Sequence, residues 1–199
     1  MQLAGLIAAP ALLVALYVVH ARSAPPDMTV AGTVPDVVAA EQVPGTVTVV
    51  DFVDFECPFC RAMDARLRAA IERAGVPVRV VRKMVPLPMH HGAIPAALAW
   101  CCADAQGRGD AMADALIAAD PAELTVEGCE RIAATVGCDL DRYRSDRAAR
   151  ATQARVDADA AAARAAGIVR LPTIYVGEEA FVGAAATPEQ LTAAIRRAS

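Results

Sequence analysis

Two cysteines separated by two residues, Cys57 and Cys60, have the types and the spacing that suit redox chemistry. They enclose Pro58 and Phe59 and follow an apolar run at 47–55, which predicts a buried strand. Helical spacing begins after the second cysteine. We therefore expect the first to lie at a helix N-terminus, where unpaired N–H groups and the helix dipole favour a thiolate. Proline at the first helical position loses no hydrogen bond. The pair can alternate between dithiol and disulfide, with Cys57 as nucleophile and Cys60 as resolving cysteine.

Half of a zinc site, or a pair of ordinary core cysteines, is the alternative interpretation of this spacing. A zinc site needs two further ligands, and the sequence contains neither a second C-x-x-C nor an H-x₃-H motif. His90 and His91 are adjacent, so they cannot both easily face one metal ion. We therefore expect no metal and no organic cofactor, because the electrons of the reaction reside on the cysteine pair.

Acidic residues interrupt the apolar run that leads to the cysteines. Asp51 lies six residues before Cys57, and a buried carboxyl there would have a raised pKa that suits proton transfer near neutral pH. Asp54 is the competing acid, on the opposite face of the strand by alternation. A purely structural, hydrogen-bonded role is the alternative for Asp51. Glu56, directly before the first cysteine, would oppose thiolate formation.

Two further features lie downstream of this motif. Leu171-Pro172-Thr173 precedes the apolar run 174–176, and an alanine-rich helical segment at about 93–167 separates it from the cysteines. Together with V-D-F-V-D-F-E-C-P-F-C, these features span about residues 45–198. In them the chain resembles the DsbA-type thiol:disulfide oxidoreductases of the thioredoxin-like superfamily. The resemblance implies an α/β thioredoxin fold with an inserted α-helical subdomain.

The resemblance also implies roles for single residues. Asp51 would relay protons to Cys60, and a cis bond would precede Pro172. The backbone of Leu171 would then bind an extended substrate peptide beside the cysteines.

Pro58 and Phe59 would tune the reduction potential and border the bound substrate. The strongest oxidants of the family have histidine in the position of Phe59, so we expect an oxidant of intermediate strength. His90 and His91 resemble a histidine-containing stretch that borders the active site, or else are surface residues.

The elements that must position these residues follow from periodicity, caps and breakers. We expect a linker with a lead-in strand at 23–45 and a thioredoxin-type domain at 46–198. The expected strands are 46–55, 77–85, 173–176 and 180–182, and the expected helices are 58–74, 95–105, 110–119, 125–137, 146–166 and 188–197.

Four more cysteines, Cys101, Cys102, Cys129 and Cys138, lie in the helical segment. Helical spacing places Cys101 and Cys129 on apolar faces, and Cys138 follows the glycine that ends its helix. Four cysteines allow three pairings, and the adjacent pair is too strained to bond to itself. We expect one structural disulfide among them, with buried thiols or a second redox pair as alternatives.

The N-terminus carries an uninterrupted apolar run at 3–19. This run predicts that the segment 1–22 is a membrane anchor or a signal segment. An uncleaved anchor is favoured over a cleaved signal, and a buried core helix is the remaining alternative. Either of the first two would place the catalytic part in the periplasm or another extracytoplasmic space. The net charge of −4, without a basic block, argues against nucleic-acid binding.

These observations predict an exported enzyme, anchored in the inner or cytoplasmic membrane, that introduces disulfides into reduced or unfolded extracytoplasmic proteins. The family resemblance implies a membrane oxidoreductase that resets its redox state. An anchored reductase or isomerase is the nearest alternative. A non-catalytic thioredoxin-like binding module is the alternative from another class.

Overall fold

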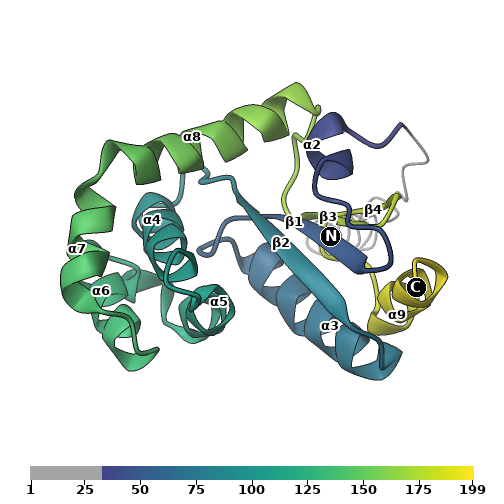
Figure 1. Ribbon diagram of the computed structural model, residues 1–199, viewed down its shortest axis with the longest axis horizontal. Helices are drawn as coiled ribbons and strands as arrows, with labels where there is room; N and C mark the ends of the chain where they lie inside the picture. The colour runs from purple at the N-terminus through teal and green to yellow at the C-terminus, as the bar shows by residue number, and fades with distance from the viewer. Residues whose placement is uncertain (1–32) are drawn as a thin grey trace, which may run out of the picture.

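The computed structural model describes residues 33–199, so the predicted anchor or signal and the first part of the linker lie outside the described residues. A four-stranded mixed sheet with the strand order β2-β1-β3-β4 forms its centre (Figure 1). The central strand β1 runs parallel to β2 and antiparallel to β3, which pairs antiparallel with β4. The strands are β1 (Val47–Val53), β2 (Val78–Met84), β3 (Thr173–Val176) and β4 (Glu179–Val182).

Helices cover both faces of this sheet, which is why all seven residues of β1 are buried. Helices α3 (Pro58–Ala74) and α9 (Pro188–Arg197) pack on one face, against Val49 and Ile174. Helices α2 (Asp36–Ala39) and α8 (Arg150–Ala165) lie on the other face, near Phe52. Because side chains alternate along a strand, the odd-numbered residues of β1 face α3.

A helical insertion between β2 and β3 makes up the other half of the molecule (Figure 1). Its core contains Trp100, Met112, Leu116 and Tyr143, and it is continuous with the cluster that holds both active-site cysteines. The insertion consists of α4 (Ala93–Asp104), α5 (Gly109–Ala118), the 3₁₀ turn η1 (Pro121–Glu123), α6 (Val126–Thr135), α7 (Leu140–Ala148) and α8. The predicted α/β fold with helices inserted into it is thereby confirmed.

One predicted helix is wrong, and the described part of the predicted linker differs from the expectation. The expected long helix at 146–166 is two helices, because Ala149 has an extended backbone (φ −74°, ψ 136°) between α7 and α8. Asp139 starts α7 by accepting the N–H of Arg142 at 3.0 Å. This helix buries only Tyr143, so its sequence has no apolar periodicity to reveal it.

The expected lead-in strand is also absent from the described part of 23–45. That part forms the short helix α2, whose Val38 is fully buried, and a single bridge between Val43 and Thr46. The extended proline Pro35 precedes the helix, and Asp36 stands in its first turn, where an acid is favourable.

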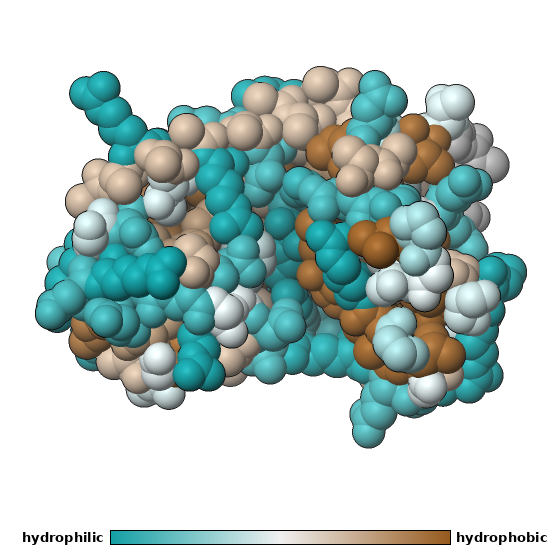
Figure 2. All heavy atoms as spheres, in the orientation of Figure 1, coloured by the Kyte–Doolittle hydropathy of each residue, from teal (hydrophilic) through white to brown (hydrophobic). Residues whose placement is uncertain are grey.

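None of the helices within residues 33–199 is long and apolar enough to cross a membrane. On the face shown in Figure 2, hydrophobic residues gather at the right, and hydrophilic and weakly hydrophobic ones cover the insertion at the left.

Candidate active site

Cys57 occupies the N-cap of α3, and Pro58 is the first helical residue. The Cys57 N–H donates to the carbonyl of Asp54 at 3.1 Å, and its own carbonyl accepts the N–H of Arg61 at 3.1 Å. The first turn of this helix contains no acidic side chain. Both Cys57 and Cys60 are 3% exposed. Cys57 therefore lies at a strand-to-helix turn, as the sequence predicted.

The two sulfurs have different surroundings, which favour a thiolate on Cys57 and a thiol on Cys60. The hydrogen bond from the Cys60 side chain lowers the pKa of Cys57 to about 6, with help from the N–H groups of Cys60 and Phe59 and against burial and the charge of Asp54. The same hydrogen bond raises the pKa of Cys60, and burial and the charges of Cys57 and Asp51 add to this effect. At neutral pH the reduced pair therefore holds its negative charge on Cys57 and its proton on Cys60.

Asp51 lies in the middle of β1, on the face that carries α3, and is 4% exposed. Burial raises the pKa of this carboxyl to about 7, with the positive charge of Arg82 opposing and the charge of Asp64 adding to the shift. Within residues 33–199, no hydrogen bond to the Asp51 carboxyl is found. Its proximity to Cys60 is visible in the pKa of that thiol, which the Asp51 charge helps to raise. Such a group can take up or release a proton near neutral pH.

Asp54 is held differently, by a full set of hydrogen bonds. Its carboxylate accepts the N–H groups of Glu56 at 2.8 Å and Leu87 at 2.9 Å, and lies 2.8 Å from Nδ1 of His90. Although partial burial opposes the charged imidazole, the hydrogen bond and charge of Asp54, followed by the charge of Cys57, raise the pKa of His90. Asp54 thus has a structural role and brings a basic group to the site, while His91 is exposed.

Glu56 makes a contact that its place in the sequence did not predict. Its carboxylate turns away to accept the N–H of Gly92, the residue before α4. The acid whose charge raises the pKa of Cys57 is Asp54. A side chain at position 92 has no room, because a Cβ there would lie 2.6 Å from Cβ of Leu124. Glycine therefore allows this loop to pack closely against the active-site turn.

The peptide bond between Leu171 and Pro172 is cis, as the family resemblance implied. Leu171 packs against the core cluster that contains both cysteines, so the loop shares a hydrophobic core with the active site. The carbonyl of Pro172 accepts the N–H of Gly183 at 2.8 Å. By contrast, the described part of the chain supplies no hydrogen bond to the backbone of Leu171, so its polar groups remain open to another strand.

Exposed apolar side chains border this turn. Phe59 is 63% exposed, Met89 on the loop of His90 is 65% exposed, and Ile94 near the start of α4 is 52% exposed. Their loops are joined to the cysteine turn through the contacts of Asp54 and Glu56. These three exposed apolar side chains therefore lie on elements that are fixed to the active-site turn.

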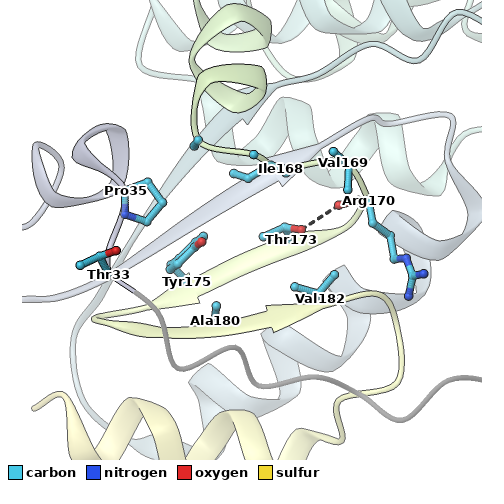
Figure 3. Close-up of a pocket in the computed structure, with 11 residues that line it drawn as sticks. Thr33, Pro35, Ile168, Val169, Arg170, Thr173, Tyr175, Ala180 and Val182 are labelled. Carbon is cyan, nitrogen blue, oxygen red and sulfur yellow. Dashed lines mark hydrogen bonds between the residues drawn. The ribbon is translucent and has the colours of Figure 1, made fainter.

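A cavity of about 320 Å³ lies on the opposite face of the sheet, where Thr173 and Tyr175 of β3 and Val182 of β4 point into it (Figure 3). Thr173 Oγ1 donates to the carbonyl of Arg170 at 2.7 Å along its wall. No cysteine lines this cavity, so it is separate from the reactive sulfurs.

The four remaining cysteines are buried in the core of the insertion. Burial raises the pKa of Cys101 and Cys129 to about 12 and that of Cys102 to about 11. The charge of Cys138 contributes to the shift of Cys102, so these two sulfurs are within electrostatic reach of each other. A structural disulfide in this group stays a prediction. Within residues 33–199, no cluster of three or more His, Cys, Asp or Glu residues is arranged to hold a metal ion.

Sequence reasoning did not identify three polar residues behind the cysteines: Arg61, Asp64 and Arg82. Arg82 is 7% exposed in β2, directly beside Asp51 in the sheet register, and Asp64 is 5% exposed on α3. A clue was present in Asp64, which falls four residues after Cys60 on the same helix face.

Comparison with known proteins places the chain in a family. The family model described as Thioredoxin matches residues 44–197, and the chain belongs to this family. A thioredoxin-like oxidoreductase from Silicibacter pomeroyi is 28% identical, with a TM-score of 0.66 over 87% of this chain and 92% of that one. The thiol-disulfide exchange protein alpha-DsbA2 from Wolbachia pipientis has a TM-score of 0.65 over 78% of this chain and 82% of that one; at 16% identity, this likeness is one of fold.

The chain is also similar to one part of a much longer curated protein. The Na(+)/H(+) antiporter NhaA 3 of Salinispora tropica is 35% identical over 131 residues, which are 65% of this chain. The chain covers only 20% of the length of that protein.

The fold, the cysteine pair at the start of α3 and the cis-proline loop agree with membership of the thioredoxin family, and the fold is similar to that of DsbA-type proteins. The resemblance stated from the sequence is thereby confirmed.

Proposed function

We propose that this chain is an extracytoplasmic oxidase that passes a Cys57–Cys60 disulfide to reduced substrate proteins. The observation that carries the proposal is the position of Cys57 at the N-cap of α3, where the Cys60 side chain and the N–H groups of Cys60 and Phe59 lower its pKa to about 6. A stabilised thiolate favours the reduced form of the pair, so the disulfide is readily given away. The apolar run at 3–19 supports export and anchoring in the inner or cytoplasmic membrane.

The exchange runs through two displacements. A substrate thiolate attacks Sγ of Cys57, the bond between the two active-site sulfurs breaks, and the Cys60 sulfur leaves and takes up a proton, for which Asp51 is the nearby donor. A second substrate thiolate then attacks the substrate sulfur of the mixed disulfide and expels the Cys57 thiolate. The substrate is oxidised and the cysteine pair is reduced by the same two electrons. A membrane oxidoreductase would reoxidise the pair, as the family resemblance implies.

Substrate binding is assigned to the surface around the turn. The backbone of Leu171, held by the cis bond to Pro172, would pair with an extended peptide, and Pro58 and Phe59 would contact it beside Cys57. Exposed Met89 and Ile94 would extend this apolar contact. The proposed substrates are reduced or unfolded proteins, because these expose apolar segments together with free thiols.

A reductase or isomerase of the same class is the second candidate. The charge of Asp54 raises the pKa of Cys57, and neither residue of the Pro58-Phe59 dipeptide adds a positive charge. Both features oppose the thiolate and so work against a strongly oxidising disulfide.

The test is oxidation of a reduced two-cysteine peptide by the oxidised full-length chain. We expect one peptide disulfide per chain, none with Cys57→Ser, and an accumulating mixed disulfide during reaction of reduced Cys60→Ser with an oxidised peptide. Cys102→Ala serves as the control and should leave the reaction unchanged. Full biological function retained by the Cys57→Ser variant would instead support the non-catalytic binding module.

A further inference from the structure

A chain of alternating charges lies behind the active site and reaches from the sheet to the insertion. Arg82 on β2 contacts Asp110 on α5, with 2.8 Å between Nη1 and Oδ1, and Asp64 on α3, with 3.8 Å between Nη2 and Oδ1. The other oxygen of Asp64 accepts from Arg68, which in turn pairs with Asp114 on α5.

Asp51 stands beside this chain of charges but outside it. Asp51 and Arg82 are direct partners in the parallel register of β1 and β2, so their side chains emerge next to each other on the α3 face. The guanidinium nevertheless makes its contacts with Asp64 and Asp110, and its Nε is buried without a hydrogen-bond partner within residues 33–199. A buried unpaired donor costs free energy, so an additional acceptor beside it would be favoured.

The remaining groups around Asp51 are accounted for. Cys60 and Asp64 face it from α3, Arg82 from β2, and its register partner on β3 is the apolar Ile174. Lys83 has the opposite parity on β2 and pairs with Glu41 and Asp159 on the other face. Arg82 is therefore the positive group on the face of Asp51 whose position decides whether that carboxyl gains an ion-pair partner.

We propose that Asp110 of the insertion, together with Asp64, holds the Arg82 guanidinium away from Asp51, and that this keeps a proton available to Cys60. Both acids are positioning residues, since neither touches the reacting sulfurs. The inference rests on the proposed function. Helix α5 of the insertion would then contribute an acid that controls the protonation of Asp51.

Asp110→Asn is the decisive variant, because this side chain is 89% exposed and its replacement leaves the core intact. The titration of the Asp51 carboxyl carbon is followed by NMR in the oxidised full-length chain, where neither Cys57 nor Cys60 carries a proton. Release of Arg82 toward Asp51 favours the carboxylate. We expect the titration midpoint to fall by about one pH unit, a tenfold change in the ionisation constant.

Asp114→Asn is the matched control. It removes the same charge from the same helix, one turn further on, but from a residue that pairs with Arg68. Its Asp51 midpoint should stay at the wild-type value. An unchanged midpoint in Asp110→Asn, or equal shifts in both variants, would overturn the inference. The oxidised protein is titrated without turnover. The midpoint of Asp51 can therefore be measured and compared between variants even if the proposed oxidase activity is absent.

Discussion

At the scale of single residues, the active site works by giving two identical thiols different surroundings. Cys57 receives hydrogen bonds from a side chain and from backbone N–H groups, whereas Cys60 is held beside a thiolate and a buried acid. The spacing of the cysteines and the proline after the first predict this division, because both features are local in sequence.

The first prediction concerns the thiolate of Cys57. Alkylation of the reduced protein with iodoacetamide should increase with pH around a midpoint near 6, because the thiolate is the reactive form and its pKa is about 6. His90→Gln removes a basic group that contacts Asp54 and should move the midpoint upward. His91→Gln removes the adjacent exposed histidine and should not move it. A wild-type midpoint near 8.5, the value of a free thiol, would contradict this description.

The sequence could not predict the network around Asp51. Asp64, Arg82 and Asp110 come from α3, β2 and α5, and only the packing of these elements brings them together. In the sequence, none of the three differs from an ordinary polar residue on a helix or a strand. The burial of Asp51 was predictable because it lies within an apolar run, and its pKa of about 7 agrees with the expected rise on burial.

At the scale of elements, helix ends with strong local signals were predicted best. Helix α3 ends before Gly75, which has φ +68°, and α9 follows the capping box of Thr187 and Gln190. Both sets of bounds agree with the sequence prediction. The boundary between α7 and α8 was missed because Ala149 gives no local signal for its extended backbone.

The second prediction concerns Gly128 in the first turn of α6. A Cβ at this position would lie 1.8 Å from the carbonyl oxygen of Glu123, so the preceding turn would have to move. Gly128→Ala should therefore reduce the free energy of unfolding by about 1–3 kcal/mol, despite the better helix propensity of alanine. Urea unfolding measures this value. Glu127→Ala, on the same turn and exposed, is the control. A more stable Gly128→Ala protein would show that the turn moves at no cost.

At the scale of the whole molecule, Arg61 connects the active-site helix to the insertion. This residue follows Cys60 directly, and its guanidinium donates to the carbonyls of Leu116 at 3.2 Å and Ala119 at 2.7 Å, at the C-terminal end of α5. It also donates to Phe55 at 2.7 Å, just before the cysteine turn. Carbonyls at a helix C-terminus lack intrahelical partners, and a cation there is favourable.

The third prediction follows from this connection. Lysine has one compact ammonium group and cannot reach all of these carbonyls, so Arg61→Lys should lower the free energy of unfolding by about 1.5–3 kcal/mol. Hydrogen exchange in α5 should become faster. Arg73→Lys, on the same helix and paired with the exposed Glu189, should have little effect on either measurement. Equal effects of the two substitutions would show that Arg61 has no special role.

The placement of the insertion relative to the sheet lay beyond the sequence prediction. Periodicity indicates that the helices between β2 and β3 exist, but the bonds of Arg61 join groups 55–58 residues apart. Contacts between residues so far apart produce no periodic pattern in the sequence. They nevertheless determine where the insertion packs against the active-site turn.

The most direct test of the central claim is the reduction potential of the Cys57–Cys60 pair, measured by equilibration with glutathione. The measurement should be repeated with the four other cysteines replaced by alanine, so that a single redox couple is observed. The low pKa of Cys57 predicts an oxidising pair, with a potential between roughly −120 and −200 mV. A potential near roughly −270 mV would contradict the proposed oxidase and identify a reductase.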